Sequence, residues 1–232
     1  MPDSDRYGAI KTFARRSARM TESQKRDYAE LSPSLCLPFS EAALNFAGLF
    51  GNAGPVTVEI GFGNGDATAQ IAESNPDANY IGIEVYRPGV ARLLGEIRRR
   101  SLRNLFIVEH DALDVFEYMF LPDSVSGVHV FFPDPWPKKR HHKRRLLQRP
   151  HTDLIASRIA AGGYIRFVTD WLPYAENAKA ALDDTPALVS RTAGNAGLAA
   201  RPETKFERSG REAARKITEL AYIKAPGSAH LA

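Results

Sequence analysis

The chain has 232 residues, of which 44% are hydrophobic and 25% are charged, and its net charge at pH 7 is +4. This composition is ordinary for a soluble globular protein, and the length suits one domain with extensions. Its single cysteine, Cys36, excludes an internal disulfide and a cysteine-only metal cluster. No apolar run reaches the roughly 18 residues of a membrane helix, and residues 1–5 are too polar for a secretory signal, so we expect a cytoplasmic protein.

The first 50 residues differ from the rest of the chain. A basic segment with three arginines lies between residues 15 and 19, and residues 41–49 have a helix-like pattern. A turn rich in glycine and proline follows at 52–55. We therefore predict a basic N-terminal extension, 1–50, and a folded domain, 51–232.

Short β-rich runs alternate with helical windows between residues 56 and 182. We predict strands at 56–60, 80–85, 105–109, 128–132 and 164–169, and helices at 67–74, 88–100, 152–160 and 172–182. This alternation is typical of βαβ units. The expected fold class is therefore α/β and Rossmann-like, with a mostly parallel sheet and helices on both faces.

The last part of the chain has a different pattern. Residues 187–192 and 216–224 have the composition of strands, and we expect a long loop through Gly194 to Gly210, without a helix, to join them. These strands should form an antiparallel pair at one edge of a seven-stranded sheet.

The loop after the first predicted strand has glycines at alternate positions. Gly61, Gly63 and Gly65 follow Glu59, and such glycines let a backbone approach a ligand closely at the carboxyl end of a strand. A dinucleotide fingerprint would need glycine or alanine where Asp66 stands, and an acid at a helix N-terminus repels a pyrophosphate. S-adenosyl-L-methionine has an ammonium and a sulfonium but no phosphate. The acidic loop therefore favours this methyl donor over a dinucleotide.

Two further acids lie at or just beyond the ends of the next two predicted strands. Glu84 stands where a carboxylate can accept both ribose hydroxyls, although an acid there would also suit NAD. Asp111 is placed to accept from an adenine amino group. Either acid alone is compatible with a solvated strand end. Together with Glu59 they indicate a ligand that contains adenosine.

The most specific segment is 130–138, which ends the fourth predicted strand. Prolines on both sides of Asp134 restrict its backbone, and Trp136 offers a face on which a base can stack. A structural proline turn with a core tryptophan is the alternative. Residues 138–149 contain seven lysines and arginines and no acid, and a second basic group lies at 98–103. Such concentrated charge attracts a polyanion, unless it is only a solvated basic face.

At this segment the sequence resembles the bacterial tRNA (guanine-N7)-methyltransferases, a family of class I S-adenosylmethionine-dependent enzymes. The resembling segments are Arg15 and Arg16, the glycine loop, residues 132–141 with 143–145, residues 169–171 with 174–176, Arg201 with Pro202, and Thr204 to Glu207. They extend from about residue 8 to residue 210. His142, where many members have asparagine, and the segment after Glu207 depart from the family pattern. The resemblance implies that 51–232 is a methyltransferase domain that modifies N7 of a guanine in the tRNA variable loop.

The same motifs suggest roles for individual residues. Donor contacts are expected at Glu59, Gly61, Gly63, Gly65, Glu84, Asp111 and Asp134; substrate contacts at Lys138, Asp170, Thr204, Lys205, Phe206 and Glu207; and RNA contacts at Arg140, His141, His142, Lys143, Arg144 and Arg145. Guanine N7 has a lone pair and no proton to lose, so an in-line displacement needs no obligatory general base. Asp134 is the expected catalytic residue, because it would orient the acceptor and stabilise the developing charge. Asp170 would either hold an edge of the guanine or cap the helix before Trp171.

Three other functions are compatible with parts of this pattern. A methyltransferase for a small molecule or a protein would not need the cations at 138–149. An RNA-binding protein without activity would not need the intact glycine loop and acids, and a dehydrogenase conflicts with Asp66. Six scattered histidines and one cysteine give no spacing for a metal site, so no metal is expected. The expected partner is tRNA, with no membrane and no obligatory protein partner.

Overall fold

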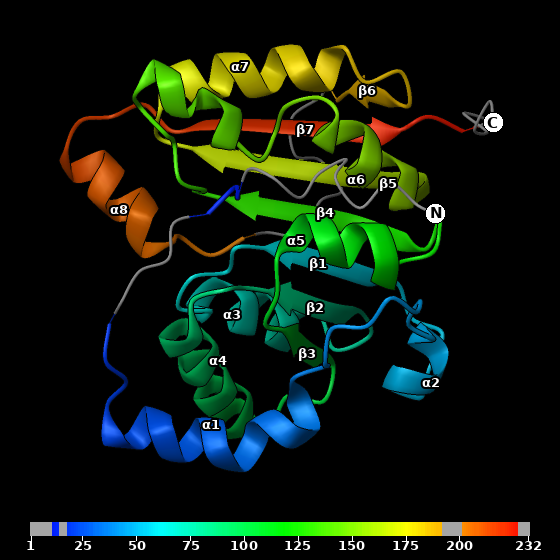
Figure 1. Ribbon diagram of the computed structural model, residues 1–232, viewed down its shortest axis with the longest axis vertical. Coiled ribbons are helices and arrows are strands. Elements are labelled where there is room, and N and C mark those ends of the chain that lie inside the picture. The colour runs from blue at the N-terminus through cyan, green and yellow to red at the C-terminus, as the bar shows by residue number, and fades with distance from the viewer. Residues whose placement is uncertain (1–10, 14–17, 192–200, 227–232) are drawn as a thin grey trace.

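The structure, a computed structural model, describes residues 11–13, 18–191 and 201–226. Its strands are β1 (Val56–Ile60), β2 (Asn79–Ile83), β3 (Leu105–Val108), β4 (Val125–Phe131), β5 (Ile159–Thr169), β6 (Leu188–Ser190) and β7 (Thr218–Lys224). They form one sheet in the order β3-β2-β1-β4-β5-β7-β6 (Figure 1). Strand β7 is antiparallel to β5 and β6, and the other neighbours are parallel. The predicted sheet with its antiparallel C-terminal pair is confirmed.

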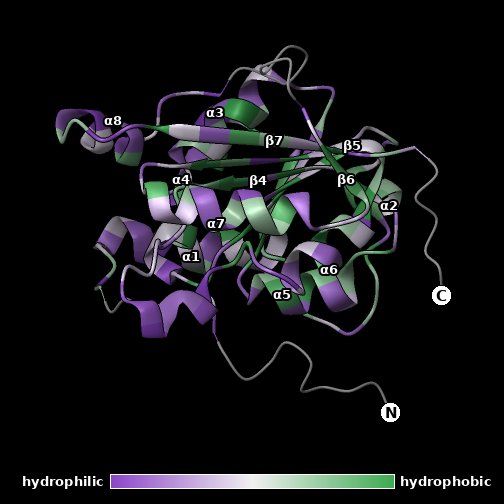
Figure 2. Ribbon diagram, turned by 90° about the horizontal axis from the view of Figure 1, so that it is seen from above, coloured by the Kyte–Doolittle hydropathy of each residue, from purple (hydrophilic) through white to green (hydrophobic). Residues whose placement is uncertain are grey.

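Helices cover both faces of this sheet, as predicted. One face packs against α3 (Asp66–Ser74) and α4 (Arg87–Arg100). The other packs against α5 (Ala112–Asp114) with the π-helical turn that follows it, α6 (His151–Arg158) and α7 (Leu172–Asp183). All five residues of β1 are buried, as expected of a parallel strand covered on both sides. Figure 2 shows the hydrophobic colour gathered on the central strands and on the helix sides that face them.

The helix α1 (Glu22–Leu35) is absent from the sequence-based prediction, although its start has a recognisable signal. The Thr21 hydroxyl accepts from the Gln24 amide at 3.2 Å, and the Gln24 side chain accepts from the Thr21 amide at 2.8 Å. This is a capping box. The helix packs against α4, and beyond it the Leu37 amide donates to the Ile107 carbonyl at 2.7 Å. Part of the predicted extension thus packs on the sheet, while the boundary at residue 50 stays a prediction.

Two predicted helices have different bounds in the structure. Helix α2 (Phe46–Phe50) begins later than residue 41, because the Asn45 side chain accepts from the Gly48 amide at 3.0 Å and fixes the start there. Helix α6 ends at Arg158, two residues before the predicted end at residue 160. The chain enters β5 at residue 159 and continues through the glycines at 162 and 163, which lie in an irregularity between the β4 pairs of Ile159 and Tyr164.

The prediction of no helix between the last two strands is also wrong. Helix α8 (Lys205–Glu212) lies there, and the Thr204 hydroxyl caps it by accepting from the Glu207 amide at 3.1 Å. Part of the predicted strand 187–192 and of the loop after it falls outside the described residues. Within the described ranges, no helix combines the length and apolarity that a membrane crossing requires.

Candidate active site

A pocket opens at the carboxyl ends of the parallel strands, where an open α/β sheet binds its ligands. Gly61, Gly63 and Glu84 line it after β1 and β2, Asp134 lines it after β4, and Phe206 lines it from α8. These residues are far apart in the sequence. The fold therefore joins the predicted donor site, the proline-rich loop and the Thr204–Glu207 segment in one pocket.

The glycine loop is built around the Glu84 carboxylate. One Glu84 oxygen accepts from the Gly63 amide at 2.8 Å, and the other accepts from the Val85 and Tyr86 amides at 2.7 and 3.0 Å. Gly63 has a φ of 60°, a conformation that L side chains rarely adopt. Three amides thus hold Glu84 as a fixed acceptor in the pocket wall.

Gly65 has a packing role at the start of α3. Its φ is 76°, and a Cβ built on it would lie 2.7 Å from Leu93 of α4. A larger residue here would separate α3 from α4. Gly65 therefore shapes the loop without lining the pocket that holds Gly61 and Gly63.

The side chain of Glu59 lies inside the sheet layer, and the described pocket wall does not include it. Only 5% of the residue is exposed. Burial, together with the negative charge of Glu84, raises the pKa of Glu59 to about 7. The carboxyl group therefore holds its proton more strongly than an exposed glutamate does, and a cation bound nearby would favour its charged form.

Asp111 is also buried, with two donors on its carboxylate. One oxygen caps α5 by accepting from the Leu113 amide at 3.1 Å, and the other accepts from the Lys11 ammonium at 3.1 Å. Its neighbours His110 and Ala112 line the pocket, but Asp111 lies behind them. The contact with Lys11 joins positions one hundred residues apart, and no local sequence pattern could have indicated it.

The proline-rich loop has two residues in left-handed backbone conformations, Phe132 with φ 49° and Trp136 with φ 47°. These turns bring Asp134 into the pocket wall. Trp136 is placed differently from the expectation. The Arg144 guanidinium covers one face of its ring at 3.8 Å, and its indole nitrogen donates to the Thr12 carbonyl at 3.3 Å. One face of Trp136 is therefore already occupied.

Among the described residues, four phenylalanine and tyrosine side chains line the pocket, and only Phe206 was predicted from the sequence as a site residue. They are Phe13, Tyr86, Phe132 and Phe206. The rings of Phe132 and Phe206 are nearly parallel, at 24°, with centroids 6.5 Å apart, and Phe206 is 51% exposed. These two rings, unlike Trp136, line the same pocket as Asp134.

The basic run 138–149 forms a short 3₁₀ helix, Lys139–Arg144, directly after the pocket loop. Lys138, Lys139, Arg140 and Lys143 are exposed, while His141 and His142 are half-buried. Arg144 donates to the carbonyl oxygens of Lys11 and Phe13 and is thus tied to the N-terminal segment. The run presents positive charge beside the pocket, as predicted.

Arg145 was expected to contact RNA with its neighbours, but the structure places its side chain inside the protein. It is only 2% exposed, and its guanidinium donates to the carbonyls of Pro135 and Pro173 at 3.1 and 3.2 Å and packs over the Tyr174 ring. Its side chain points inward because the pocket loop and α7 supply these acceptors. Arg145 therefore supports the loop from behind and does not face solvent with its neighbours.

The second basic group, in α4, is largely neutralised. Arg98 pairs with Asp27 and Glu30, and Arg99 and Arg100 pair with Glu96. The arginines at positions 15 and 16 lie outside the described residues. Within the described chain, the run after the pocket loop is therefore the stronger candidate for binding a polyanion.

Asp170 follows β5 and does not cap a helix. Helix α7 begins after Trp171, with no side-chain cap, and the Asp170 carboxylate pairs with Arg215 at 3.1 Å. In α8, Lys205 is exposed and Phe206 faces the pocket. Glu207 is buried at 3% exposure, and its carboxylate accepts from Arg201 and Arg211. Of the Thr204–Glu207 segment, only Phe206 lines the pocket.

Comparisons with known proteins show the family to which the chain belongs. The family model Methyltransf_4, described as "Putative methyltransferase", matches residues 53–220. A tRNA (guanine-N(7)-)-methyltransferase of Treponema pallidum (strain Nichols) is 46% identical, over 96% of this chain and 99% of the relative. The chain belongs to the tRNA (guanine-N7)-methyltransferase family.

Other members of the family support the same assignment. The tRNA (guanine-N(7)-)-methyltransferase of Dechloromonas aromatica (strain RCB) is 43% identical, over 94% of this chain and 89% of that protein. Among solved structures, one titled "Structure of an antibiotic related Methyltransferase" superposes with a TM-score of 0.55 at 15% identity, covering 83% of this chain and 99% of that one. This structural likeness shows the class I methyltransferase fold.

Proposed function

We propose that this protein transfers the methyl group of S-adenosyl-L-methionine to N7 of a guanine in the variable loop of tRNA. The observation that carries the proposal is the continuity of pocket and basic surface. Asp134 lines the pocket, and exposed Lys138 lies four positions later at the start of the cationic run. A nucleic acid bound to the run can therefore place a base beside Asp134. The family to which the chain belongs favours tRNA as that nucleic acid.

The pocket residues fit S-adenosyl-L-methionine. Glu84, oriented by three amides, has the position and charge to accept from the ribose hydroxyls. Gly61 has no heavy atom within 4 Å of the place that a Cβ would occupy, so the backbone there is open to a ligand. The Glu84 carboxylate in the pocket wall also suits a cationic donor. Asp111 would reach an adenine amino group only if its contact with Lys11 is exchanged.

The bound donor supplies an electrophilic methyl group on a cationic sulfur. Guanine N7 attacks this carbon, the carbon–sulfur bond breaks, and the positive charge passes to the purine ring. Asp134 stabilises that ring charge from the pocket wall, and Phe132 and Phe206 give the planar base surfaces to stack on. The residues of this chain thus act mainly by alignment and electrostatics.

The cationic run binds the phosphates of the tRNA. Lys138, Lys139, Arg140 and Lys143 are exposed on one short segment, and lysine binds phosphate as a flexible point charge. Contacts to phosphate position a nucleic acid without reading its sequence. Selection of one guanine therefore depends on the shape of tRNA and on the pocket.

The Asp134→Ala variant tests the assignment of the pocket. Loss of a carboxylate that acts on the developing charge is expected to lower the single-turnover rate of methyl transfer about 100-fold, within the range measured for single electrostatic groups. Donor affinity, measured by calorimetry, should change little. Asp77→Ala, at an exposed position, is the matched control. A folded Asp134→Ala protein with the wild-type rate would refute the catalytic role.

A further inference from the structure

Helix α8 presents Phe206 to the pocket, but it has little apolar surface of its own to hold it in place. Of its eight residues, only Glu207 and Gly210 are buried. In Figure 1 the helix lies beyond the carboxyl ends of β4 and β5, and Figure 2 shows it as mostly hydrophilic. Its position must therefore come largely from polar contacts with the sheet.

Arg201 supplies the most buried of these contacts. Only 9% of its side chain is exposed, and its guanidinium donates to the Glu207 carboxylate, whose side chain is 5% exposed. The same guanidinium lies 3.6 Å from the Glu219 carboxylate of β7, which accepts from Arg166 of β5 at 2.6 Å. Arg201 thus connects α8 to two strands of the sheet.

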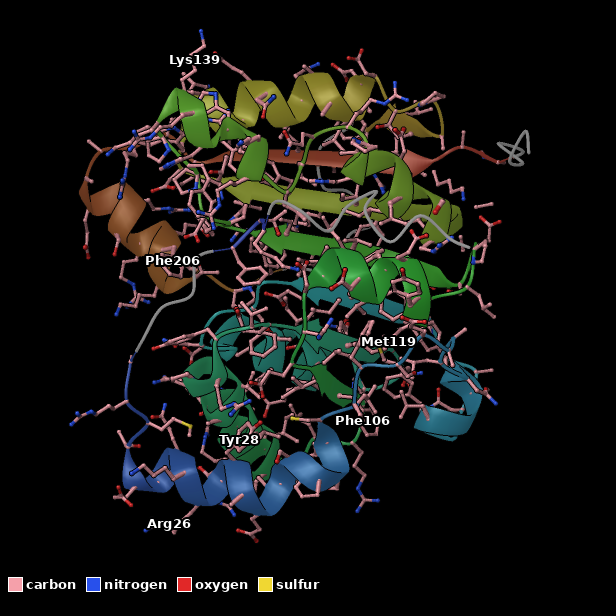
Figure 3. All side chains as sticks on the ribbon, in the orientation of Figure 1. Arg26, Tyr28, Phe106, Met119, Lys139 and Phe206 are labelled. Atoms are coloured by element: carbon pink, nitrogen blue, oxygen red, sulfur yellow. The ribbon has the colours of Figure 1, made fainter. Side chains whose placement is uncertain are left out.

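Arg201 also contacts the base of the pocket loop. Its guanidinium carbon lies 5.7 Å from the centroid of the Phe131 ring, and Phe131 is followed by Phe132 in the pocket wall. Phe206 is next to Glu207 in the sequence and stacks near Phe132. Figure 3 shows Phe206 at α8, close to the ends of the strands. One arginine therefore contacts the sequence neighbours of two aromatic residues of the pocket, Phe132 and Phe206.

We propose that Arg201 is a positioning residue for the acceptor base: its ion pairs with Glu207 and Glu219 fix α8 so that Phe206 stands beside Phe132 at the pocket. The proposal rests on the proposed function, because the base that stacks there is the acceptor. It also assigns Glu207 to the support of α8, since its carboxylate is turned toward Arg201 and Arg211 and away from the pocket wall.

The electrostatics of Glu207 agree with this assignment. Burial acts to raise the pKa of Glu207, but hydrogen bonds from Arg201 and Arg211 outweigh burial and hold the pKa below its usual value. The group is therefore charged at neutral pH and remains paired. Buried ion pairs often add little net stability. Removing one partner, however, leaves an uncompensated buried charge. Such a pair can therefore select one arrangement of α8 on the sheet.

A double-mutant cycle with Arg201→Ala and Phe206→Ala tests the proposal. If Arg201 acts through Phe206, each single variant lowers the single-turnover methylation rate about 100-fold, and the double variant is no slower than Phe206→Ala alone. Donor affinity and tRNA affinity stay within about threefold of wild type for Arg201→Ala. Arg201→Lys, which keeps the charge but loses the planar fork, recovers part of the rate. Independent, multiplicative losses in the cycle would overturn the proposal.

Hydrogen exchange of the α8 amides gives a readout that does not depend on activity. Arg201→Ala and Arg201→Lys should each speed exchange in α8 and leave β4 protected as in wild type. Arg208→Ala is the matched control, because Arg208 lies on the same helix with a side chain that is 65% exposed. Unchanged α8 exchange in both Arg201 variants would refute the positioning role. A wild-type protein that does not methylate tRNA would refute the proposed function, and the exchange experiment would still decide the role of Arg201.

Discussion

At the scale of single residues, the acids near the pocket are similar side chains, but their different burial gives them different roles. Three backbone amides fix Glu84 in the pocket wall, whereas Glu59 is enclosed within the sheet layer. The sequence places both acids, and also Asp111, at or near the ends of consecutive strands, and their contacts with a donor stay a prediction. The burial of the Arg145 side chain and the contacts of Trp136 could not be predicted. Both depend on partners distant in sequence, Pro173 for Arg145 and Thr12 for Trp136.

Glu59→Gln should change how stability depends on pH. The folded state raises the pKa of Glu59 from 4.5 to about 7, so between these values the folded protein holds more protons than the unfolded chain. The free energy of unfolding therefore falls as pH rises through this window, by about 3 kcal/mol in total. Glu59→Gln has no carboxyl group to titrate, so its free energy of unfolding does not fall in this way. The difference in free energy of unfolding between the variant and the wild type should therefore shift in favour of the variant between pH 4.5 and pH 8.

Chemical denaturation across that pH range measures the effect, with Glu41→Gln at an exposed position as the control. The comparison depends on the pH trend and not on the absolute stability, since the amide can pack differently from the carboxyl. Parallel stability curves for wild type and Glu59→Gln would show that Glu59 does not titrate in this window.

Among the elements, the strands and the central helices were predictable, because buried parallel strands have continuous apolar runs and the glycine loop separates β1 from α3. Helices α1 and α8 were missed, since polar residues dominate both. Their caps were nevertheless visible in the sequence, as Thr21 with Gln24 and Thr204 with Glu207. Polar helices that are held by caps and ion pairs give little hydrophobic periodicity to read.

The short helix Lys139–Arg144 is expected to set the salt dependence of tRNA binding. Replacing Lys139 and Lys143 by alanine removes two exposed cations and should reduce the slope of log affinity against log salt concentration by about two. Filter binding or fluorescence anisotropy over a range of salt concentrations measures this slope. Arg99→Ala is the control, because its guanidinium is already paired with Glu96. An unchanged slope in the double variant would place the RNA surface elsewhere.

In the whole molecule, the sheet order brings four segments that are far apart in the sequence together at the carboxyl ends of the strands: the loops after β1, β2 and β4, and helix α8. The family motifs therefore meet at one pocket. The motifs themselves could be recognised from the sequence, and relatives at 40–46% identity confirm the family. Which aromatic rings face the pocket, and which charges support α8, could not be read from the motifs. Those features depend on how α8 and the N-terminal segment close over the strand ends.

The most direct test of the account is to incubate the purified protein with labelled S-adenosyl-L-methionine and an unmodified tRNA transcript, and then to identify the methylated nucleoside. We predict N7-methylguanosine, which disappears when the variable-loop guanine of the transcript is replaced by adenine. Transfer to a different base or position, or no transfer to tRNA by a protein that binds the donor, would contradict the proposed function.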